Sequence, residues 1–361
     1  MSQPLRPVIK QSRPGRGAIS RDNGRFERFA REDVQDGWDI PEELPVLRTF
    51  VSDEVPRSVI NYVRSPDLPF DRTLNPYRGC EHGCIYCFAR PSHAYLGLSP
   101  GLDFETRLVA RPSAPQVLAR ELRAKRYKVA PLAIGTNTDP YQPIERDRGI
   151  MRACLEVLRD FRHPVAIVTK GTLIERDIDI LSDMARDGLV RVGVSVTTLD
   201  PILSRRMEPR CPAPKRRLET IRRLTKAGVP VRVMASPMVP ALTDPELEAI
   251  LEAGRDAGAG AASWIMLRLP REVAELWQEW LEEHYPARKT RIMGHLRDMH
   301  GGEVYSSTWF ARMRGEGPYA QILAQRFDRA VRALGLDAPQ PSLRSDLFKV
   351  PPQAGDQLTL F

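Results

Sequence analysis

Residues 72–87 read RTLNPYRGCEHGCIYC, which places three cysteines in one short loop directly after an expected strand at 72–77. Cys80, Cys84 and Cys87 have the spacing C-x3-C-x2-C, so their thiolates can converge on one soft metal centre. A cubane [4Fe-4S] cluster contains four irons, and three cysteines leave one iron without a protein ligand. Such an iron can bind a small molecule through an amine and a carboxylate. The loop therefore favours an iron–sulfur cluster with one open position.

A zinc knuckle is the alternative for the same loop, with His82 or a distant cysteine as the fourth ligand. Structural zinc sites usually bring two separate pairs of ligands, whereas Cys154 and Cys211 are isolated from other cysteines. Cys154 also falls on an apolar helical face, where we expect it to serve in packing. The spacing favours the open cluster over zinc.

The composition of the 361-residue chain is that of a globular protein, with 42% hydrophobic and 28% charged residues. No stretch approaches the roughly 18 uninterrupted apolar residues of a membrane span, and residues 1–6 lack the apolar segment of a secretory signal. Five cysteines are too few, and odd in number, for a small secreted protein held by disulfides. We therefore expect a cytoplasmic protein with no membrane partner.

The net charge is +8, because 54 basic residues stand against 46 acidic ones, and most of the basic residues are arginine. Two segments, 6–31 and 205–226, hold most of the excess. Arginine suits bidentate contacts with phosphate, so a nucleic acid is one interpretation and genome composition is the other. The charge permits DNA as a partner without establishing it.

Beyond the cysteine loop, short apolar runs alternate with amphipathic stretches. β-branched residues dominate most of the runs, as in strands that are buried on both faces. Besides the weaker strand at 72–77, the expected strands are 131–135, 165–169, 190–196, 229–235 and 263–267. Successive strands are about 25 to 40 residues apart, which is the length of a βα unit in a parallel sheet.

Six such units predict an α/β fold: a partial (β/α)6 TIM-like barrel, or at minimum an open parallel sheet, with its chemistry at the carboxyl ends of the strands. We expect a basic, partly disordered arm at 1–65 and a core domain at 66–301. The remainder, 302–361, is expected to hold a helix around 318–334 and a flexible tail.

Apolar residues at spacings of three and four predict helices over 150–161, 218–224 and 247–251. Thr243 followed by Glu246 predicts a capping box at the start of the last helix. Gly228 and Gly258 stand where helices should end before the next strand.

The cysteine loop resembles that of the radical S-adenosylmethionine (SAM) superfamily, which has this spacing and an aromatic residue before the last cysteine, here Tyr86. Residues 75–90 look more specifically like the spore photoproduct lyase-like branch, loosely called DNA repair photolyases. The stretches TDPYQPIE at 138–145 and MEPR at 207–210 match patterns of that branch. With residues 16–18 and 92–98, they are similar to an uncharacterised bacterial subgroup within it.

This resemblance implies that Cys80, Cys84 and Cys87 hold a [4Fe-4S] cluster whose fourth iron chelates SAM. One electron, from a reductant such as flavodoxin or ferredoxin, would cleave SAM to methionine and a 5′-deoxyadenosyl radical. The residues that the resemblance assigns to SAM are Tyr86 at the adenine, Thr136, Asn137 and Thr138 near the amino group, Lys170 at the carboxylate and Ser195 at the ribose.

Each of these assignments has a simpler alternative. Tyr86 could only pack beside the cluster, Lys170 could be a surface lysine at a helix start, and Ser195 could face away. Asp139 and Glu145 could be turn and capping residues as readily as substrate contacts.

One departure from the family pattern concerns the hydrogen-atom donor. The spore lyase carries a further cysteine near the end of the second strand, where this chain has GTNT at 135–138. That specific lesion reversal is therefore not expected. Cys211, in a proline-flanked loop that looks exposed, is a weak catalytic candidate as a substitute donor.

The chain ends DQLTLF, which resembles the short peptide by which many bacterial repair proteins dock on the sliding clamp. A flexible arm would present Leu360 and Phe361 to an apolar pocket, with Gln357 and Leu358 before them. A chance apolar tail is the alternative.

Three functional hypotheses follow. The first is a radical SAM enzyme acting on DNA or a nucleotide lesion in repair. The second is a radical SAM enzyme acting on a protein, tRNA or small molecule. The third is a non-catalytic iron–sulfur or zinc protein that binds nucleic acid. It is disfavoured because an open cluster on a parallel α/β scaffold is typical of a catalytic site.

Overall fold

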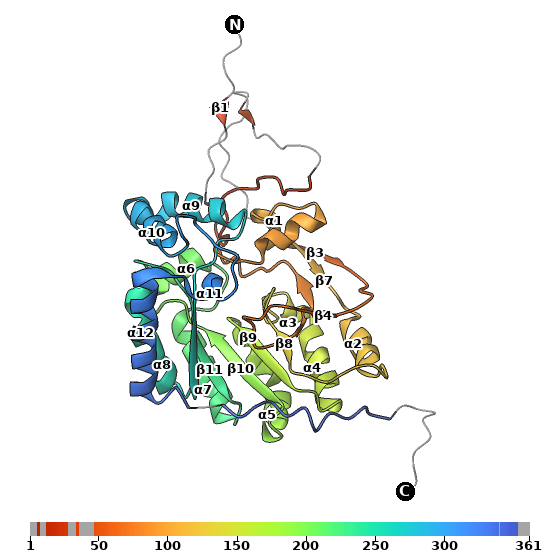
Figure 1. Ribbon diagram of the computed structural model, residues 1–361. Coiled ribbons are helices and arrows are strands. Elements are labelled where there is room, and N and C mark those ends of the chain that lie inside the picture. Colours follow the sequence, from red (N-terminus) through yellow and green to blue (C-terminus); the bar gives the residue numbers. More distant parts are fainter. Residues whose placement is uncertain (1–5, 8–11, 28–33, 36–46, 339, 353–361) are drawn as a thin grey trace.

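Six parallel strands stand side by side at the centre of the protein, in the order in which they occur along the chain (Figure 1). The computed structural model describes residues 6–7, 12–27, 34–35, 47–338 and 340–352. The parallel strands are β5 (Arg72–Leu74), β8 (Leu132–Ile134), β9 (Val165–Thr169), β10 (Val190–Ser195), β11 (Val231–Met238) and β12 (Ala261–Met266). β4 (Ile60–Tyr62) pairs antiparallel with β5 at one edge of the sheet and β12 forms the other. The expected partial barrel of six βα units is confirmed.

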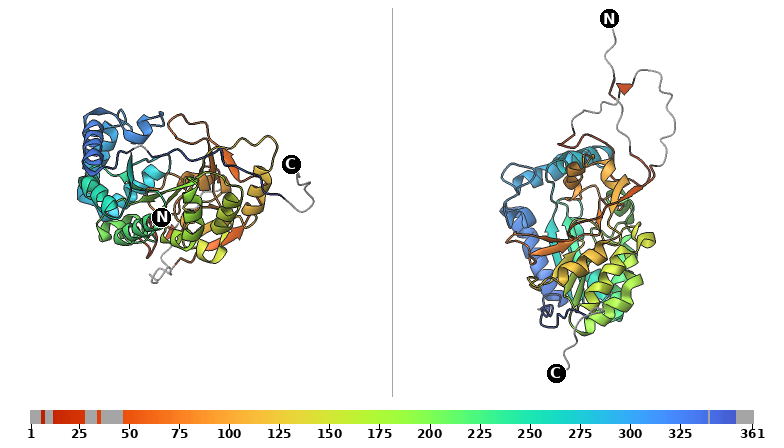
Figure 2. Two further views of the ribbon diagram at one scale, coloured as in Figure 1. Left: turned by 90° about the horizontal axis from the view of Figure 1, so that it is seen from below. Right: turned by 90° about the vertical axis from the view of Figure 1, so that its right-hand side faces the viewer.

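Helices that connect successive strands surround the sheet (Figure 2). They are α2 (Ala114–Leu122), α3 (Glu145–Arg148), α4 (Ile150–Asp160), α5 (Ile178–Arg186), α6 (Pro201–Met207), α7 (Pro214–Lys226) and α8 (Leu247–Asp256), with the 3-10 turns η2 (Thr172–Asp177) and η3 (Asp244–Glu246). Helix α4 buries the apolar stripe that its spacing predicts, including Cys154, which is fully buried. Gly228 and Gly258 follow α7 and α8 with positive φ, as expected at helix ends.

The remaining elements flank this core. After the cysteine loop come η1 (Arg90–Leu96), α1 (Leu102–Thr106) and β7 (Arg107–Ala110). β7 is the middle strand of a second, three-stranded sheet, between β3 (Phe50–Asp53) and β6 (Tyr77–Arg78), which both precede the loop. The chain continues past β12 through α9 (Val273–His284), α10 (Pro286–Asp298), α11 (Ala311–Arg314) and α12 (Gly317–Leu334). Two short strands, β1 (Arg6–Pro7) and β2 (Val34–Gln35), pair with each other. No helix in the described part of the chain is long and apolar enough to cross a membrane.

Residues 12–27 and 47–65 differ from the extended arm expected there. β4 belongs to the central sheet, β3 pairs with β7, and Ala18 is fully buried. The backbone amides of Gly17 and Ala18 donate to the carboxylate of Glu105, both at 2.9 Å. The stretch around Gly17 and Ala18 therefore packs into the folded body, because a buried carboxylate satisfies its backbone amides.

The capping box expected at Thr243 and Glu246 is wrong. The Thr243 hydroxyl accepts from the Val239 amide at 2.8 Å, and the Glu246 carboxylate accepts from Thr198 and from the Leu199 amide, each at 2.6 Å. Glu246 thus connects α8 to the loop after β10 and does not close its own helix end.

The segment 340–352 crosses the amino-terminal ends of the strands (Figure 1). The Arg344 amide donates to the Gly188 carbonyl and the Lys349 amide to the Phe161 carbonyl, just before β10 and β9. Phe348 packs against His163, at a ring distance of 5.6 Å. Helix α12 lies against α8, with Arg326 paired to Glu248 at 2.6 Å. The expected clamp peptide, Gln357 to Phe361, lies outside the described residues.

Candidate active site

A cavity of about 280 Å³ opens at the carboxyl ends of the parallel strands. Cys80, Cys84 and Cys87 line it together with side chains from the ends of β8 to β12. The residues that sequence analysis assigned to SAM also line it, namely Tyr86, Thr136, Asn137, Thr138, Lys170 and Ser195. The fold thus brings these residues together from four segments of the chain, at the position where α/β barrels bind ligands.

Two glycines let the cysteine loop turn tightly. Gly79 and Gly83 have φ values of +75° and +66°, in the left-handed region that favours glycine. A Cβ atom at Gly83 would lie 2.7 Å from Oε2 of Glu105. The loop therefore depends on glycine for both its conformation and its close packing.

Arg90 fixes the backbone of the same loop through hydrogen bonds. Its guanidinium is fully buried and donates to the carbonyls of Cys84 at 3.0 Å and Gly83 at 3.1 Å, and to the Glu105 carboxylate at 2.5 Å. Gly17 closes the loop from the other side, where a Cβ atom would lie only 2.0 Å from the Gly83 carbonyl oxygen. The backbone of the loop is thus fixed by a buried ion pair and by the amino-terminal segment.

The chemistry of the donor set fits a cluster. Cys80, Cys84 and Cys87 line one cavity, and a cubane takes one cysteine on each of three irons and keeps its fourth iron open toward that cavity. His82, the zinc ligand considered from sequence, lies with Nδ1 3.3 Å from Asp139 Oδ2 instead.

Tyr86 is anchored at its hydroxyl. The hydroxyl donates to the Glu208 carboxylate, and the hydroxyl of Thr197 lies 3.3 Å away. The ring faces the Lys170 ammonium, with Nζ 5.7 Å from the ring centroid. The ring therefore has a fixed orientation at the cavity wall.

Glu208 is a buried site residue that sequence reasoning had placed only within a family motif. It is 1% exposed and forms an ion pair with Arg217, which is equally buried. Burial opposes the charged carboxylate, but the charges of Arg217 and Lys170 outweigh it and hold the Glu208 pKa at about 2. Arg217 also donates to the Ser195 carbonyl at 3.1 Å, so this network joins Tyr86 to β10.

The loop after β8 presents different polar groups. Thr138 is buried and its hydroxyl donates to the Tyr77 carbonyl at 3.1 Å, whereas the side chain of Asn137 is exposed. The Asp139 carboxylate accepts from the Thr169 hydroxyl at 2.6 Å and from the Lys170 amide at 2.7 Å. Asp139 therefore ties the ends of β8 and β9 together, while Thr136 and Asn137 face the cavity.

Ser195 lines the cavity at the end of β10, and its hydroxyl donates to the Ser236 carbonyl at 2.8 Å. Ser236, on β11, also lines the cavity, and its own buried hydroxyl has no protein partner among the described residues. Sequence analysis missed Ser236 because nothing in the alternating pattern of β11 marks that position.

Cys211 differs from the exposed residue expected from its proline-flanked loop. It is 9% exposed, does not line the cavity, and places Sγ 3.8 Å from Sγ of Cys84. A hydrogen bond from Cys211 lowers the pKa of Cys84 to about 7, ahead of the opposing effect of burial. Cys211 thus lies behind a proposed cluster ligand, where a substrate in the cavity does not reach it.

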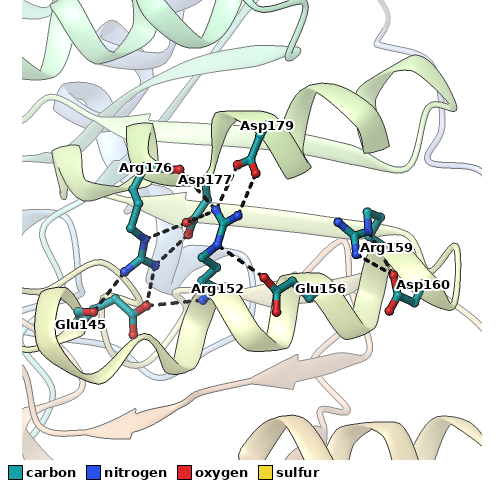
Figure 3. Close-up of polar contacts among 8 residues, drawn as sticks. All are labelled: Glu145, Arg152, Glu156, Arg159, Asp160, Arg176, Asp177 and Asp179. Atoms are coloured by element: carbon teal, nitrogen blue, oxygen red, sulfur yellow. Dashed lines mark hydrogen bonds and ion pairs between the residues drawn. The ribbon is translucent and has the colours of Figure 1, made fainter.

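Glu145 lies in a network of charged residues at the start of α4 (Figure 3) and does not line the cavity. Its carboxylate accepts from the amides of Met151 and Arg152 at the start of α4, and from the Arg176 guanidinium at 2.7 Å. Arg176 pairs in turn with Asp177 at 2.7 Å. Of the two roles considered from sequence, the contacts of Glu145 are those of a capping residue.

The comparisons with known proteins agree with this geometry. The family model described as the radical SAM superfamily matches residues 74–254. The chain belongs to the radical SAM superfamily. An uncharacterized protein of Mycobacterium tuberculosis is 38% identical over 238 residues, covering 65% of this chain and 70% of that protein. An uncharacterized protein of Methanocaldococcus jannaschii is 25% identical over 228 residues, covering 63% and 80%.

Solved structures of spore photoproduct lyase share the fold of this radical SAM protein. A point variant of that lyase matches with a TM-score of 0.57 at 14% identity, covering 79% of this chain and 80% of the other. The lyase complexed with dinucleoside spore photoproduct matches with a TM-score of 0.56 at 13% identity, covering 79% of each chain. At such identity the likeness shows the fold alone.

Radical SAM enzymes use a [4Fe-4S] cluster and SAM, and these are the cofactors of this enzyme. When bound, the pair supplies a reductive cleavage that the protein's own side chains cannot perform. What the chain itself supplies is a fixed cysteine loop, an oriented aromatic ring, and the Lys170 ammonium and hydroxyl groups that line the cavity.

Proposed function

We propose that Cys80, Cys84 and Cys87 hold the cluster and that the enzyme cleaves SAM reductively to a 5′-deoxyadenosyl radical. The observation that carries this proposal is the single cavity that the three cysteines share with the ends of β8 to β12. In it, Tyr86 offers a ring to the adenine and Lys170 a cation to the carboxylate. Thr136, Asn137, Thr138 and Ser195 surround the remaining polar groups of SAM.

The proposed substrate is DNA or a nucleotide lesion, in repair. The solved lyase complexed with dinucleoside spore photoproduct shares the fold, and the net charge of +8 suits an acidic partner. Because the residues after β8 include no cysteine, the hydrogen atom returned to the substrate would come from elsewhere than in the spore lyase. A protein, tRNA or small-molecule substrate is the second candidate.

Anaerobic reconstitution with iron and sulfide, followed by dithionite and SAM, tests the cofactor assignment. The wild-type enzyme is expected to form 5′-deoxyadenosine, and Cys84→Ala to form none, because one cluster ligand is missing. Cys154→Ala is the matched control, since Cys154 is buried in α4 and does not line the cavity. A cluster-loaded wild-type enzyme that leaves SAM intact would contradict the proposal.

The proposed partners are a reductant such as flavodoxin or ferredoxin and the sliding clamp. The clamp would take the terminal peptide through Gln357, Leu358, Leu360 and Phe361, filling an apolar pocket. Calorimetry with the full chain should detect micromolar binding that is lost when Leu360 and Phe361 are both changed to Ala. Equal heats from the wild type and the double variant would remove the clamp from the proposal.

A further inference from the structure

A second cavity, of about 600 Å³, adjoins the first and shares part of its wall. The shared residues include Phe88, Thr136, Asn137, Arg268 and Met313. A molecule in this outer cavity would therefore lie directly against whatever the inner cavity holds. If the inner cavity holds SAM, as proposed above, the outer cavity is the place from which a substrate meets the radical.

The outer cavity is lined by four arginines, and three of them have carboxylate partners. Arg78 and Arg111 share Glu54, at 3.1 Å and 3.2 Å, and Arg312 forms two contacts of 2.6 Å with Asp67. Four guanidinium groups therefore meet only two carboxylates. The cavity keeps an excess of positive charge, which favours an anionic ligand.

Arg268 is the exception among these arginines. It follows β12 and has no carboxylate within ion-pair distance in the described part of the chain. Its Nε is buried without a hydrogen-bond partner, and its Nη2 donates to the Tyr305 hydroxyl at 3.3 Å. A buried guanidinium donor without an acceptor is costly in the free protein, so its position in both cavity walls points to an acceptor that a ligand brings.

Exposed aromatic rings line the same cavity as this unpaired cation. The Arg268 guanidinium carbon lies 4.8 Å from the centroid of the Phe88 ring, and Phe88 is still 42% exposed. Tyr95, 67% exposed, also lines the outer cavity and has Phe26 beside it, with their ring centroids 5.1 Å apart. Exposed rings beside arginine are what unstacked nucleobases bind.

We propose that the outer cavity binds a nucleotide, that Arg268 binds its phosphate through its guanidinium, and that Phe88 and Tyr95 stack on the nucleobases. This inference rests on the proposed function, because it assigns the substrate of that site. A planar guanidinium suits phosphate through two parallel hydrogen bonds, which the free Nε can join. A single strand and a free nucleotide both present this phosphate and base chemistry, and the experiment below distinguishes them.

Binding of a fluorescein-labelled oligo(dT) strand to the anaerobic holoenzyme with SAM tests the inference, by anisotropy at several salt concentrations. Arg268→Gln should weaken binding about tenfold, as expected for losing a charged hydrogen bond. It should also flatten the plot of log affinity against log salt by about 0.7, the value of one phosphate contact on a single strand. Arg268→Lys should recover the slope, since it restores the charge.

Two further variants separate phosphate contact from stacking and from general charge. Tyr95→Leu, at an exposed position, should weaken binding severalfold and leave the salt slope unchanged. Arg186→Gln removes the same charge from α5, where Arg186 is exposed and paired with Asp183, and should change neither quantity. Competition by dTMP as effective as the unlabelled strand would identify a free nucleotide as the ligand. Weaker competition would identify the strand.

An affinity and salt slope of Arg268→Gln equal to those of the wild type would overturn the inference, as would a wild-type enzyme that binds neither probe. Formation of 5′-deoxyadenosine by the same wild-type sample is measured in parallel. If it is formed while Arg268→Gln binds normally, only this inference fails. If none is formed, the proposed function fails.

Discussion

Individual charged residues are buried in pairs behind the cysteine loop. Arg90 with Glu105 and Arg217 with Glu208 have side chains that are 0 to 1% exposed. Removing one member of such a pair leaves its partner charged and without a counterion in a site that water does not reach. The orientation of the loop and of Tyr86 therefore depends on a few single residues.

Glu208→Gln should lower the free energy of unfolding by about 3 kcal/mol or more, because it leaves Arg217 without a counterion. Urea unfolding, followed by tryptophan fluorescence, measures the change. Glu219→Gln is the control, since Glu219 pairs with Arg222 and Arg223 on the exposed face of α7, where the change should stay within about 0.5 kcal/mol. If the two variants lose the same amount of unfolding free energy, the buried ion pair contributes no more to stability than the exposed one.

Cys84 and Cys211 should form a disulfide when the cluster-free protein is exposed to air. Their sulfurs are 3.8 Å apart, so the bond requires a closure of about 1.8 Å. Dioxygen would accept the two electrons and two protons that the thiols release, giving hydrogen peroxide. Mass spectrometry of unreduced peptides should find the Cys84–Cys211 link, absent from Cys211→Ser. A link between Cys80 and Cys87 in its place would contradict this expectation.

At the scale of elements, the segment that contains Gly17 packs directly against the cysteine loop. Gly17→Ala would place a methyl group 2.0 Å from the Gly83 carbonyl oxygen, so one of the two backbones must move, at a cost of about 2 kcal/mol. We expect less iron and sulfide per chain after anaerobic gel filtration. Gly260→Ala, with nothing within 4 Å of its added Cβ, should retain the wild-type content. If both variants keep full clusters, the contact is not needed to hold the loop.

The strands and the cysteine loop could be predicted from sequence because their signals are local: a period of two or a run of β-branched residues, and a fixed spacing of thiols. The role of Gly17 and Ala18 could not be predicted, because their amides bond to Glu105, almost ninety residues away. The capping box predicted at Glu246 was wrong for the same reason, since the Glu246 carboxylate accepts a hydrogen bond from the distant Thr198 and not from its own helix turn. Arg268 gave only a weak signal, as an arginine directly after an expected strand.

At the scale of the whole molecule, the carboxyl and amino ends of the barrel strands differ in function. The inner cavity opens at the carboxyl ends of the strands, whereas His163 is fully buried at the opposite end, before β9. His163 Nε2 lies 2.7 Å from the Tyr127 hydroxyl, and Nδ1 lies 2.9 Å from the Pro164 carbonyl. A neutral ring satisfies both contacts, with Nδ1 donating and Nε2 accepting. Residues at this end of a barrel serve stability.

His163 should make the protein sensitive to mild acid. Burial lowers its pKa to about 4, helped by the charge of Arg72, whereas an unfolded chain has the ordinary value near 6.5. Arg72 is paired with Asp71, and the rings that contact His163 are those of Tyr127 and the apolar Phe348. Below pH 6.5 the unfolded state therefore binds a proton at His163 that the folded state does not bind. The free energy of unfolding then falls as the pH falls.

Between pH 7.5 and 5, the wild type should lose about 2 kcal/mol more of its unfolding free energy than His163→Gln does. Urea unfolding of both proteins without cluster, at matched pH values, measures the difference. Parallel curves of stability against pH would show that His163 does not titrate in this range.

The segment 340–352 crosses the amino-terminal ends of the strands, at the base of the barrel, which is the end opposite the inner cavity. Attachment to a solid support through a linker joined after Pro352 would thus turn the opening of the inner cavity toward the solution. A bulky fusion before Gly17 would instead crowd the loop that carries the cysteines. Sensor surfaces and pull-down resins for this enzyme should be coupled from its base.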